Sequence, residues 1–185
     1  MKNKKNYKLG FTLLELLIVV VIIGILAAIA LPQYQLAVDK ADFTKYQSMV
    51  ASLRDAYNEH ILIHGTGTKK FEDLSFTLPN DFQNSYTSGY YNCVSNDTMF
   101  CCISDTGIST TAAINCGKND LSIIYHEGFI GINGAEHSDK RGTCRASDSN
   151  TRANRLCTSI GTYTRQGIAW TPEGYDNLYK VYHLK

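Results

Sequence analysis

The feature that most constrains this chain is a long apolar run near its start, FTLLELLIVVVIIGILAAIAL. The run covers residues 11–31, 21 residues in all, and Glu15 is its only charged residue. A helix of this length spans about 31 Å, close to the ~30 Å hydrocarbon core of a bilayer. Secretory signals have a shorter apolar region of about 7–15 residues, followed by a small-residue cleavage site. The run therefore predicts a single membrane anchor that remains part of the protein.

The charges on either side of this run predict its orientation. Four lysines and no acid lie in the first ten residues, whereas the first charges after residue 31 balance one another. The positive-inside rule then places the N-terminus in the cytoplasm and the rest of the chain on the other side. The formal net charge is +1, so residues 11–185 carry 1 − 4 = −3. This bulk charge does not favour a nucleic-acid partner.

The helical pattern continues beyond the apolar run. Apolar side chains recur at steps of three or four residues, at Phe43, Tyr46, Val50, Leu53, Tyr57 and Ile61. This spacing predicts an amphipathic helix that ends at Gly65 and Gly67. We therefore expect one long helix over residues 11–64, of which the second half buries a stripe against the rest of the chain. Gly24 and Pro32 are predicted points of kinking or unwinding in this helix.

The remaining residues, 65–185, are expected to form a globular head. Strand-like segments lie at 121–125, 128–133 and 178–184, and the glycine at 128 suggests a hairpin between the first two. The polar, basic stretch at 139–165 contains DSNTRANRLC, which predicts a short helix. The pattern indicates an α+β fold in which a small antiparallel sheet packs on the amphipathic half of the long helix.

The chain contains six cysteines, Cys93, Cys101, Cys102, Cys116, Cys144 and Cys157. An even count in an exported domain indicates disulfides, and the sequence has no CxxC spacing that would favour zinc. Cys144 and Cys157 enclose a short polar loop and are predicted to pair. The adjacent Cys101 and Cys102 are each expected to join Cys93 or Cys116, so that the connectivity of these four stays open.

Other possible sites carry weaker signals. His60 and His64 lie one helical turn apart, but two histidines do not make a metal site, and we interpret them as solvated. The basic stretch at 139–165 has no aromatic interleaving or known motif, so a subunit-contact or solvated surface is favoured over a DNA-binding one. No nucleophile–base arrangement is legible. We therefore predict that the protein is not an enzyme and has no metal or cofactor.

The segment KLGFTLLELLIVVVIIGILAAIALPQYQ resembles the N-terminus of type IV prepilins and pseudopilins. The resemblance covers about the first 36 residues. It rests on a short basic leader that ends at Gly10, on Phe11 and Glu15 directly after it, and on an apolar span that contains Gly24 and Pro32.

This resemblance implies a pilin fold and a maturation pathway. A prepilin peptidase would cut between Gly10 and Phe11, removing residues 1–10 in the cytoplasm, and would N-methylate Phe11. Inner-membrane assembly machinery would then extract the subunits. Residues 11–31 would bundle with the same segments of identical or homologous pilin subunits and form the filament core. Residues 32–64 would be the amphipathic half of the helix, and residues 65–185 would be the head. Glu15 resembles the family glutamate that pairs with the terminal amine of a neighbouring subunit.

Elementary electrostatics gives a reason for such a pairing. An unpaired carboxylate is costly in apolar surroundings, and cleavage creates an ammonium at Phe11. Phe11 and Glu15 lie four residues apart and hence on the same helix face. The pair would favour one axial register between subunits, similar to a polar residue in a coiled-coil seam. The spacing allows Phe11 of the same chain, whereas the resemblance points to Phe11 of a neighbour.

We therefore expect a structural subunit of a type IV pilus that serves adhesion, motility or related surface functions. Before assembly it would span the inner membrane once, and afterwards it would lie in the extracellular filament. The alternative is a pseudopilin of a type II secretion system in a periplasmic pseudopilus. The cysteine-rich head favours the pilin over the pseudopilin. A DNA-binding minor pilin of an uptake system is a third possibility, which rests on the basic stretch alone.

Overall fold

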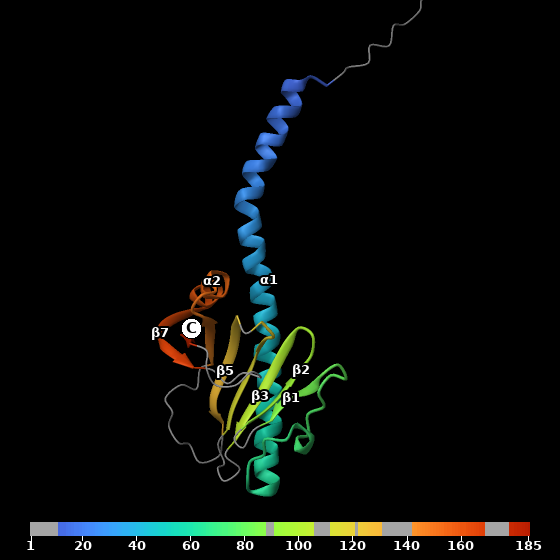
Figure 1. The fold of residues 1–185 in the computed structure, drawn as a ribbon, viewed down its shortest axis with the longest axis vertical. Helices are drawn as coiled ribbons and strands as arrows, with labels where there is room; N and C mark the ends of the chain where they lie inside the picture. Colours follow the sequence, from blue (N-terminus) through green and yellow to red (C-terminus); the bar gives the residue numbers. More distant parts are fainter. Residues whose placement is uncertain (1–10, 88–90, 106–111, 121, 131–141, 169–177) are drawn as a thin grey trace, which may run out of the picture. The chain divides into compact units, whose positions relative to one another are not determined.

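The computed structural model describes residues 11–87, 91–105, 112–120, 122–130, 142–168 and 178–185. The chain divides into two compact units, residues 1–38 and residues 39–185. Figure 1 shows the elements, which in chain order are α1 (Leu13–His64), the 3₁₀ turn η1 (Phe71–Asp73), β1 (Gln83–Thr87), β2 (Tyr91–Ser95), β3 (Met99–Asp105), β4 (Ala112–Lys118), β5 (Ile123–Ile130), β6 (Thr143–Ser147), α2 (Thr151–Ile160), β7 (Gly161–Ile168) and β8 (Leu178–Leu184).

The second half of α1 buries the stripe that the sequence predicts. Its buried residues are Phe43, Tyr46, Val50, Leu53, Ala56, Tyr57 and Ile61, so the expected amphipathic helix is confirmed. The helix stops where predicted. Gly65 adopts a left-handed φ of 75°, a conformation that glycine adopts without steric cost, and its N–H donates to the carbonyl oxygen of Ile61 at 2.8 Å.

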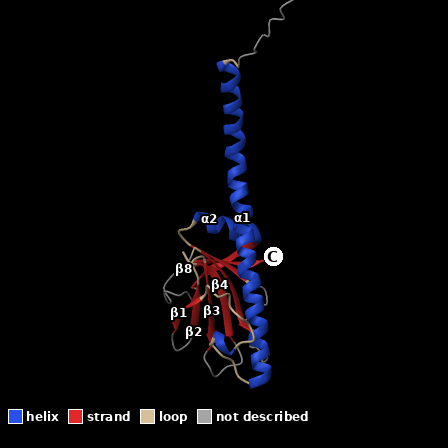
Figure 2. Ribbon diagram, turned by 90° about the vertical axis from the view of Figure 1, so that its right-hand side faces the viewer, coloured by secondary structure: helices blue, strands red, loops and turns tan. Residues whose placement is uncertain are grey.

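An eight-stranded sheet forms the body of the second unit. Its strand order is β1-β2-β3-β4-β5-β6-β8-β7, and every neighbouring pair is antiparallel. The second half of α1 lies against one face of the sheet (Figure 2). There the ring of Phe43 meets that of Tyr125 on β5 edge to face, with centroids 5.7 Å apart. The α+β pilin fold expected from the sequence is thus present, with a larger sheet than predicted.

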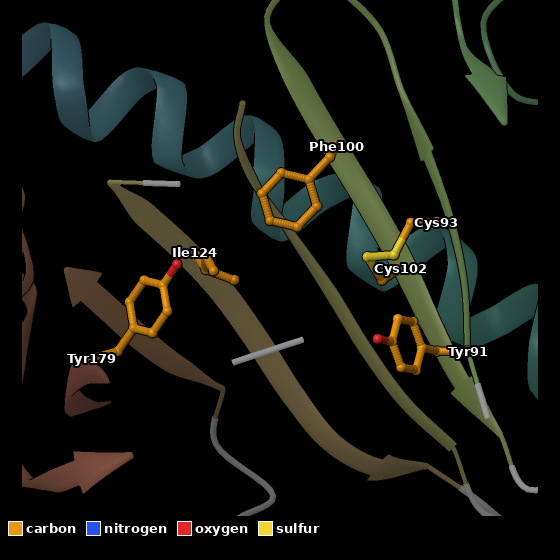
Figure 3. Close-up of a cluster of buried hydrophobic side chains, with 6 residues drawn as sticks. All are labelled: Tyr91, Cys93, Phe100, Cys102, Ile124 and Tyr179. Atoms are coloured by element: carbon orange, nitrogen blue, oxygen red, sulfur yellow. A yellow bond between two sulfur atoms is a disulfide. The ribbon is translucent and has the colours of Figure 1, made fainter. Parts of the chain in front are cut away.

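The opposite face of the sheet carries a second group of buried side chains. Figure 3 shows them as Tyr91, Cys93, Phe100, Cys102, Ile124 and Tyr179, contributed by β2, β3, β5 and β8. Successive side chains of a strand point to opposite faces, so Ile124 points away from the face on which the neighbouring Tyr125 meets α1. Strands buried on both faces lose the polar–apolar alternation by which a half-exposed strand is recognised.

One expectation about the strands needs correction. The hairpin at Gly128 is wrong, because β5 runs through this residue as one strand from Ile123 to Ile130. Its partners are β4 and β6 on either side, and the pairing with β4 accommodates a register shift between Ala112 and Ile114. Residues 121 and 131–133 of the expected strands lie outside the described part of the chain.

Strands β1 to β4 are not predicted from the sequence, because they are rich in Cys, Asn and Ser rather than in β-branched residues. The strand at 178–184 and the short helix within DSNTRANRLC are confirmed as β8 and α2.

Candidate assembly segment

The first unit consists of the apolar half of α1, and its large side chains are exposed. Leu13 is 88% exposed and Phe11 80% exposed, and the large apolar residues at positions 14–31 of this unit are likewise among the exposed ones. Among the described residues, α1 is the one helix that is long and apolar enough to cross a membrane. A continuous apolar surface of this kind does not persist in water, so it requires lipid or other protein around it.

Glu15 has a partner within its own chain, and that partner is Thr12. Thr12 precedes the first residue of α1, and its hydroxyl accepts the backbone N–H of Glu15 at 3.2 Å. In return, Oε2 of Glu15 accepts the backbone N–H of Thr12 at 2.9 Å and the Thr12 hydroxyl at 2.8 Å. This reciprocal arrangement is a capping box, which satisfies N–H groups that the first turn of a helix leaves without intrahelical acceptors.

The capping box is a feature that our sequence reasoning missed. Its signature, Thr-x-x-Glu directly before an apolar run, is legible in TLLE at residues 12–15. The prediction from the sequence concerns only the pairing of Glu15 with an amine. The structure brings Glu15 together with Thr12, while the proposed pairing of Glu15 with the amine of Phe11 concerns a cleaved chain and stays a prediction. Gly10 lies outside the described residues.

The two helix breakers of the sequence both lie within α1. The helix is continuous from Leu13 to His64, with Pro32 inside it. A Cβ atom added at Gly24 would meet no other atom within 4 Å. A contact within the chain therefore does not explain the glycine, and the prediction that Gly24 and Pro32 are points of kinking or unwinding stays open.

Three disulfides join all six cysteines of the head. Cys93 pairs with Cys102 and Cys101 with Cys116, which gives the connectivity that the sequence left open, and Cys144 pairs with Cys157. The first two link directly opposed residues of β2, β3 and β4. Because Cys101 and Cys102 are consecutive in β3, their bonds lie on opposite faces of the sheet. The third bond ties α2 to β6.

A charged contact fixes α1 to the centre of the sheet. Nη1 of Arg54 donates to Oε1 of Glu127 on β5 at 2.6 Å, and the Glu127 side chain is only 11% exposed. Hydrogen bonding to Glu127 raises the pKa of Arg54. Next to this pair, burial, together with the charge of Glu127, raises the pKa of Tyr125 to about 12. Removal of one partner would leave the other charge partly buried and unpaired, which makes this contact a determinant of how the helix seats on the sheet.

The weaker candidate sites have structural roles where they are described. The rings of His60 and His64 stack with centroids 4.2 Å apart, and their Nδ1 atoms contact the carbonyl oxygens of Asp73 and His60. The described part of the basic stretch forms β6, α2 and much of β7, while residues 139–141 lie outside the described part.

The comparisons with known proteins concern the same N-terminal region. The prokaryotic N-terminal methylation motif matches residues 5–31. The chain is 38% identical over 85 residues to the type IV major fimbrial protein FimA of Dichelobacter nodosus, covering 46% of this chain and 53% of FimA. It is 55% identical over 53 residues to a fimbrial protein of Pseudomonas aeruginosa, covering 29% and 34% of the two chains. No solved structure gives a significant match.

A third relative gives the same result. The type IV major pilin protein PilE of Neisseria gonorrhoeae is 43% identical over 60 residues, which is 32% of this chain and 36% of PilE. The chain thus spans about half the length, or about a third, of the curated relatives it matches. The long helix, apolar at its start and packed on a sheet at its end, gives the chain the α+β pilin fold. Its N-terminal segment is similar in sequence to the N-termini of type IV fimbrial proteins and pilins.

Proposed function

We propose that this protein is a structural subunit of a type IV pilus and polymerises through the first half of α1. The observation that carries this proposal is the exposure of the whole apolar segment, of which no large side chain between Phe11 and Leu31 is buried in the subunit. Lipid can cover this surface before assembly, and the same segments of other copies can cover it afterwards. Contacts that do not close on themselves would then build an open helical filament.

Maturation would prepare this segment for assembly. We infer that a prepilin peptidase cuts after Gly10 and methylates Phe11, so that the protein is a substrate rather than an enzyme. The lysines of the leader, residues 1–10, favour a cytoplasmic N-terminus in the inner membrane before assembly. Residues 11–31 would form the filament core, residues 32–64 the amphipathic half of the helix, and residues 65–185 the head. Gly24 and Pro32 would be the points at which the helix adapts to its neighbours.

The capping box suggests how Glu15 is accommodated between membrane and filament. In the subunit its carboxylate accepts two hydrogen bonds from Thr12. In the filament we propose that it also pairs with the amine of Phe11 of a neighbouring subunit. A carboxylate that retains hydrogen bonds at each stage avoids the full cost of an unpaired charge in apolar surroundings. The pair would select one axial register.

The names of the relatives favour a pilus over the secretion pseudopilus that shares this N-terminal design. The relatives described above are fimbrial proteins and a major pilin. Within the described part of the basic stretch, Arg152 already pairs with Asp39, which lowers the positive charge available to bind DNA.

The decisive experiment expresses the chain in a host that carries pilus assembly machinery. Electron microscopy of sheared surface filaments, with mass spectrometry of their subunits, should find a chain that begins at methylated Phe11. Glu15→Val should insert in the membrane but yield at least about tenfold fewer filaments. The reason is that loss of a charge pair that contributes more than about 1.4 kcal/mol shifts the assembly equilibrium at least about tenfold. Glu72→Val, at an exposed glutamate of η1, is the matched control and should assemble normally. Normal filament yield from Glu15→Val would contradict the proposed role of the glutamate.

A further inference from the structure

One contact joins α1 to α2 at Asp39, where the second compact unit of the chain, residues 39–185 and here called the head unit, begins. Nε and Nη2 of Arg152, on α2, donate to Oδ2 and Oδ1 of Asp39, on α1, both at 2.8 Å. The two residues lie 113 positions apart in the sequence. The side chain of Asp39 is 18% exposed and that of Arg152 60% exposed. Two parallel hydrogen bonds between guanidinium and carboxylate fix orientation as well as distance.

Arg152 is presented by a helix that is itself firmly attached to the sheet. The disulfide between Cys157 and Cys144 joins α2 to β6, and Leu156 is 2% exposed. The side-chain oxygen of Asn154 accepts the hydroxyl of Tyr182 on β8 at 2.9 Å. Both views show α2 beside α1 at one end of the sheet (Figures 1 and 2). The guanidinium therefore projects from a fixed support rather than from a loop.

Asp39 occupies a special position along α1. It is the first residue of the head unit, and Phe43, the first buried residue of the helix, follows one turn later. Among the described residues, no side chain of α1 before Phe43 is buried. Pro32, which interrupts the hydrogen bonding of the helix, lies less than two turns before Asp39. Along the helix, the ion pair thus lies between the helix breaker and the buried stripe.

We propose that Arg152 is a positioning residue that clamps the first turn of α1 in the head, so that bending or unwinding around Pro32 stops at Asp39. The clamp would hold the head unchanged while the preceding part of the helix adapts to its surroundings. Its use in a filament rests on the proposed function, whereas the clamp itself is a property of the single chain. An exposed ion pair contributes little to global stability, so the expected effect is local.

Hydrogen–deuterium exchange of the full chain in detergent micelles tests the clamp. In Arg152→Ala, the backbone amides of residues 39–43 should exchange about two- to fivefold faster than in the wild type, the range given by one exposed ion pair. The amides of residues 50–61 should not change. Lys180→Ala removes the other ion pair near α2, with Asp148 at 3.0 Å, and is the matched control that should leave residues 39–43 unaffected.

A charge swap separates a specific clamp from a general loss of packing. Asp39→Arg combined with Arg152→Asp should restore the wild-type exchange rates, whereas each single reversal should accelerate exchange at residues 39–43. The proposal is overturned by unchanged rates in Arg152→Ala, by the same acceleration in Lys180→Ala, by equal acceleration along residues 39–61, or by failure of the swap to restore protection.

A second arm relates the clamp to assembly and keeps the two proposals apart. If the wild-type chain forms filaments, Arg152→Ala filaments should break more readily under shear than wild-type filaments, and the charge swap should reverse this; equal breakage would overturn the role of the clamp in the filament. If the wild-type chain forms no filaments, the proposed function fails, while the exchange experiment still decides whether the clamp exists.

Discussion

The two halves of α1 are built from one continuous helix but meet opposite surroundings. In the second half, Leu53 and Tyr57 are fully buried against the sheet. In the first half, residues of equal or greater hydrophobicity, such as Leu16 and Ile22, remain more than half exposed. Among the residues that the structure describes, only the second half of α1 is covered by the rest of the chain. Lipid or other protein can cover the exposed first half, which is the physical reason to regard it as an assembly segment.

The largest effect should come from a cavity in the covered half. Leu53→Ala should lower the free energy of unfolding of the head by about 3–5 kcal/mol, because it removes a fully buried side chain. Leu16→Ala, at an exposed position of the first half, should change it by less than about 0.5 kcal/mol. Denaturant unfolding of both variants in the same micelles measures the contrast. Comparable destabilisation would mean that the first half, too, is packed within the subunit.

The disulfides should matter to the head alone. Cys101 and Cys116 are 15 residues apart, and loss of their bond should destabilise the head by about 3 kcal/mol on the loop-entropy estimate. Thermal unfolding of the Cys101→Ser, Cys116→Ser double variant should show this loss. The helicity of residues 13–31 in micelles should stay unchanged. A decrease in that helicity would indicate that the first half of α1 depends on the head.

A smaller effect concerns pH and the buried His126. Its imidazole is 9% exposed, and burial, with the nearby charge of Arg145, lowers its pKa well below the usual value. Unfolded His126 binds a proton below about pH 6.5, while the folded residue does not, so acid favours the unfolded state. Head stability should therefore be unaffected by this residue above about pH 7. Below about pH 6 it should fall by up to about 1.4 kcal/mol per pH unit.

The variant His126→Gln isolates this contribution. Equilibrium unfolding at about pH 7.5 and about pH 5, roughly one unit above and one and a half units below the reference pKa, should show a smaller loss of stability in the variant than in the wild type. His64→Gln, at an exposed histidine of α1, is the matched control for the chemical change from histidine to glutamine. An identical pH dependence in His126→Gln and wild type would show that His126 does not couple folding to protons.

The smallest effect lies at the start of the first half. Thr12→Ala removes both reciprocal hydrogen bonds of the Thr12 hydroxyl and should weaken the first turn of α1 by about 1 kcal/mol. Exchange of the amides at residues 13–16 in micelles should therefore increase about fivefold. Thr44→Ala, which removes a hydroxyl that donates to the carbonyl oxygen of Lys40 within the helix, is the control. Equal exchange in both variants would argue against a capping role for Thr12.

Local patterns made much of this protein predictable. The apolar run, the amphipathic stripe and the glycine stop at residue 65 each depend on neighbours within one or two helical turns, and each is found in α1. The short helix around Arg152 and the strand at residues 178–184 are likewise local features. The capping box is equally local, because Thr12 and Glu15 of TLLE lie three residues apart.

The sequence by itself determined that one helix would have an apolar half and an amphipathic half, and that the cysteines would form disulfides. Only the tertiary structure decided which cysteines pair, that β5 passes through Gly128, and that Arg152 meets Asp39. The reason is the distance along the sequence between the residues that interact. Helix periodicity and capping join residues three or four apart, whereas the disulfides of β3 join residues 9 and 15 positions apart and the clamp joins residues 113 positions apart. No local pattern fixes such partners before the chain has folded.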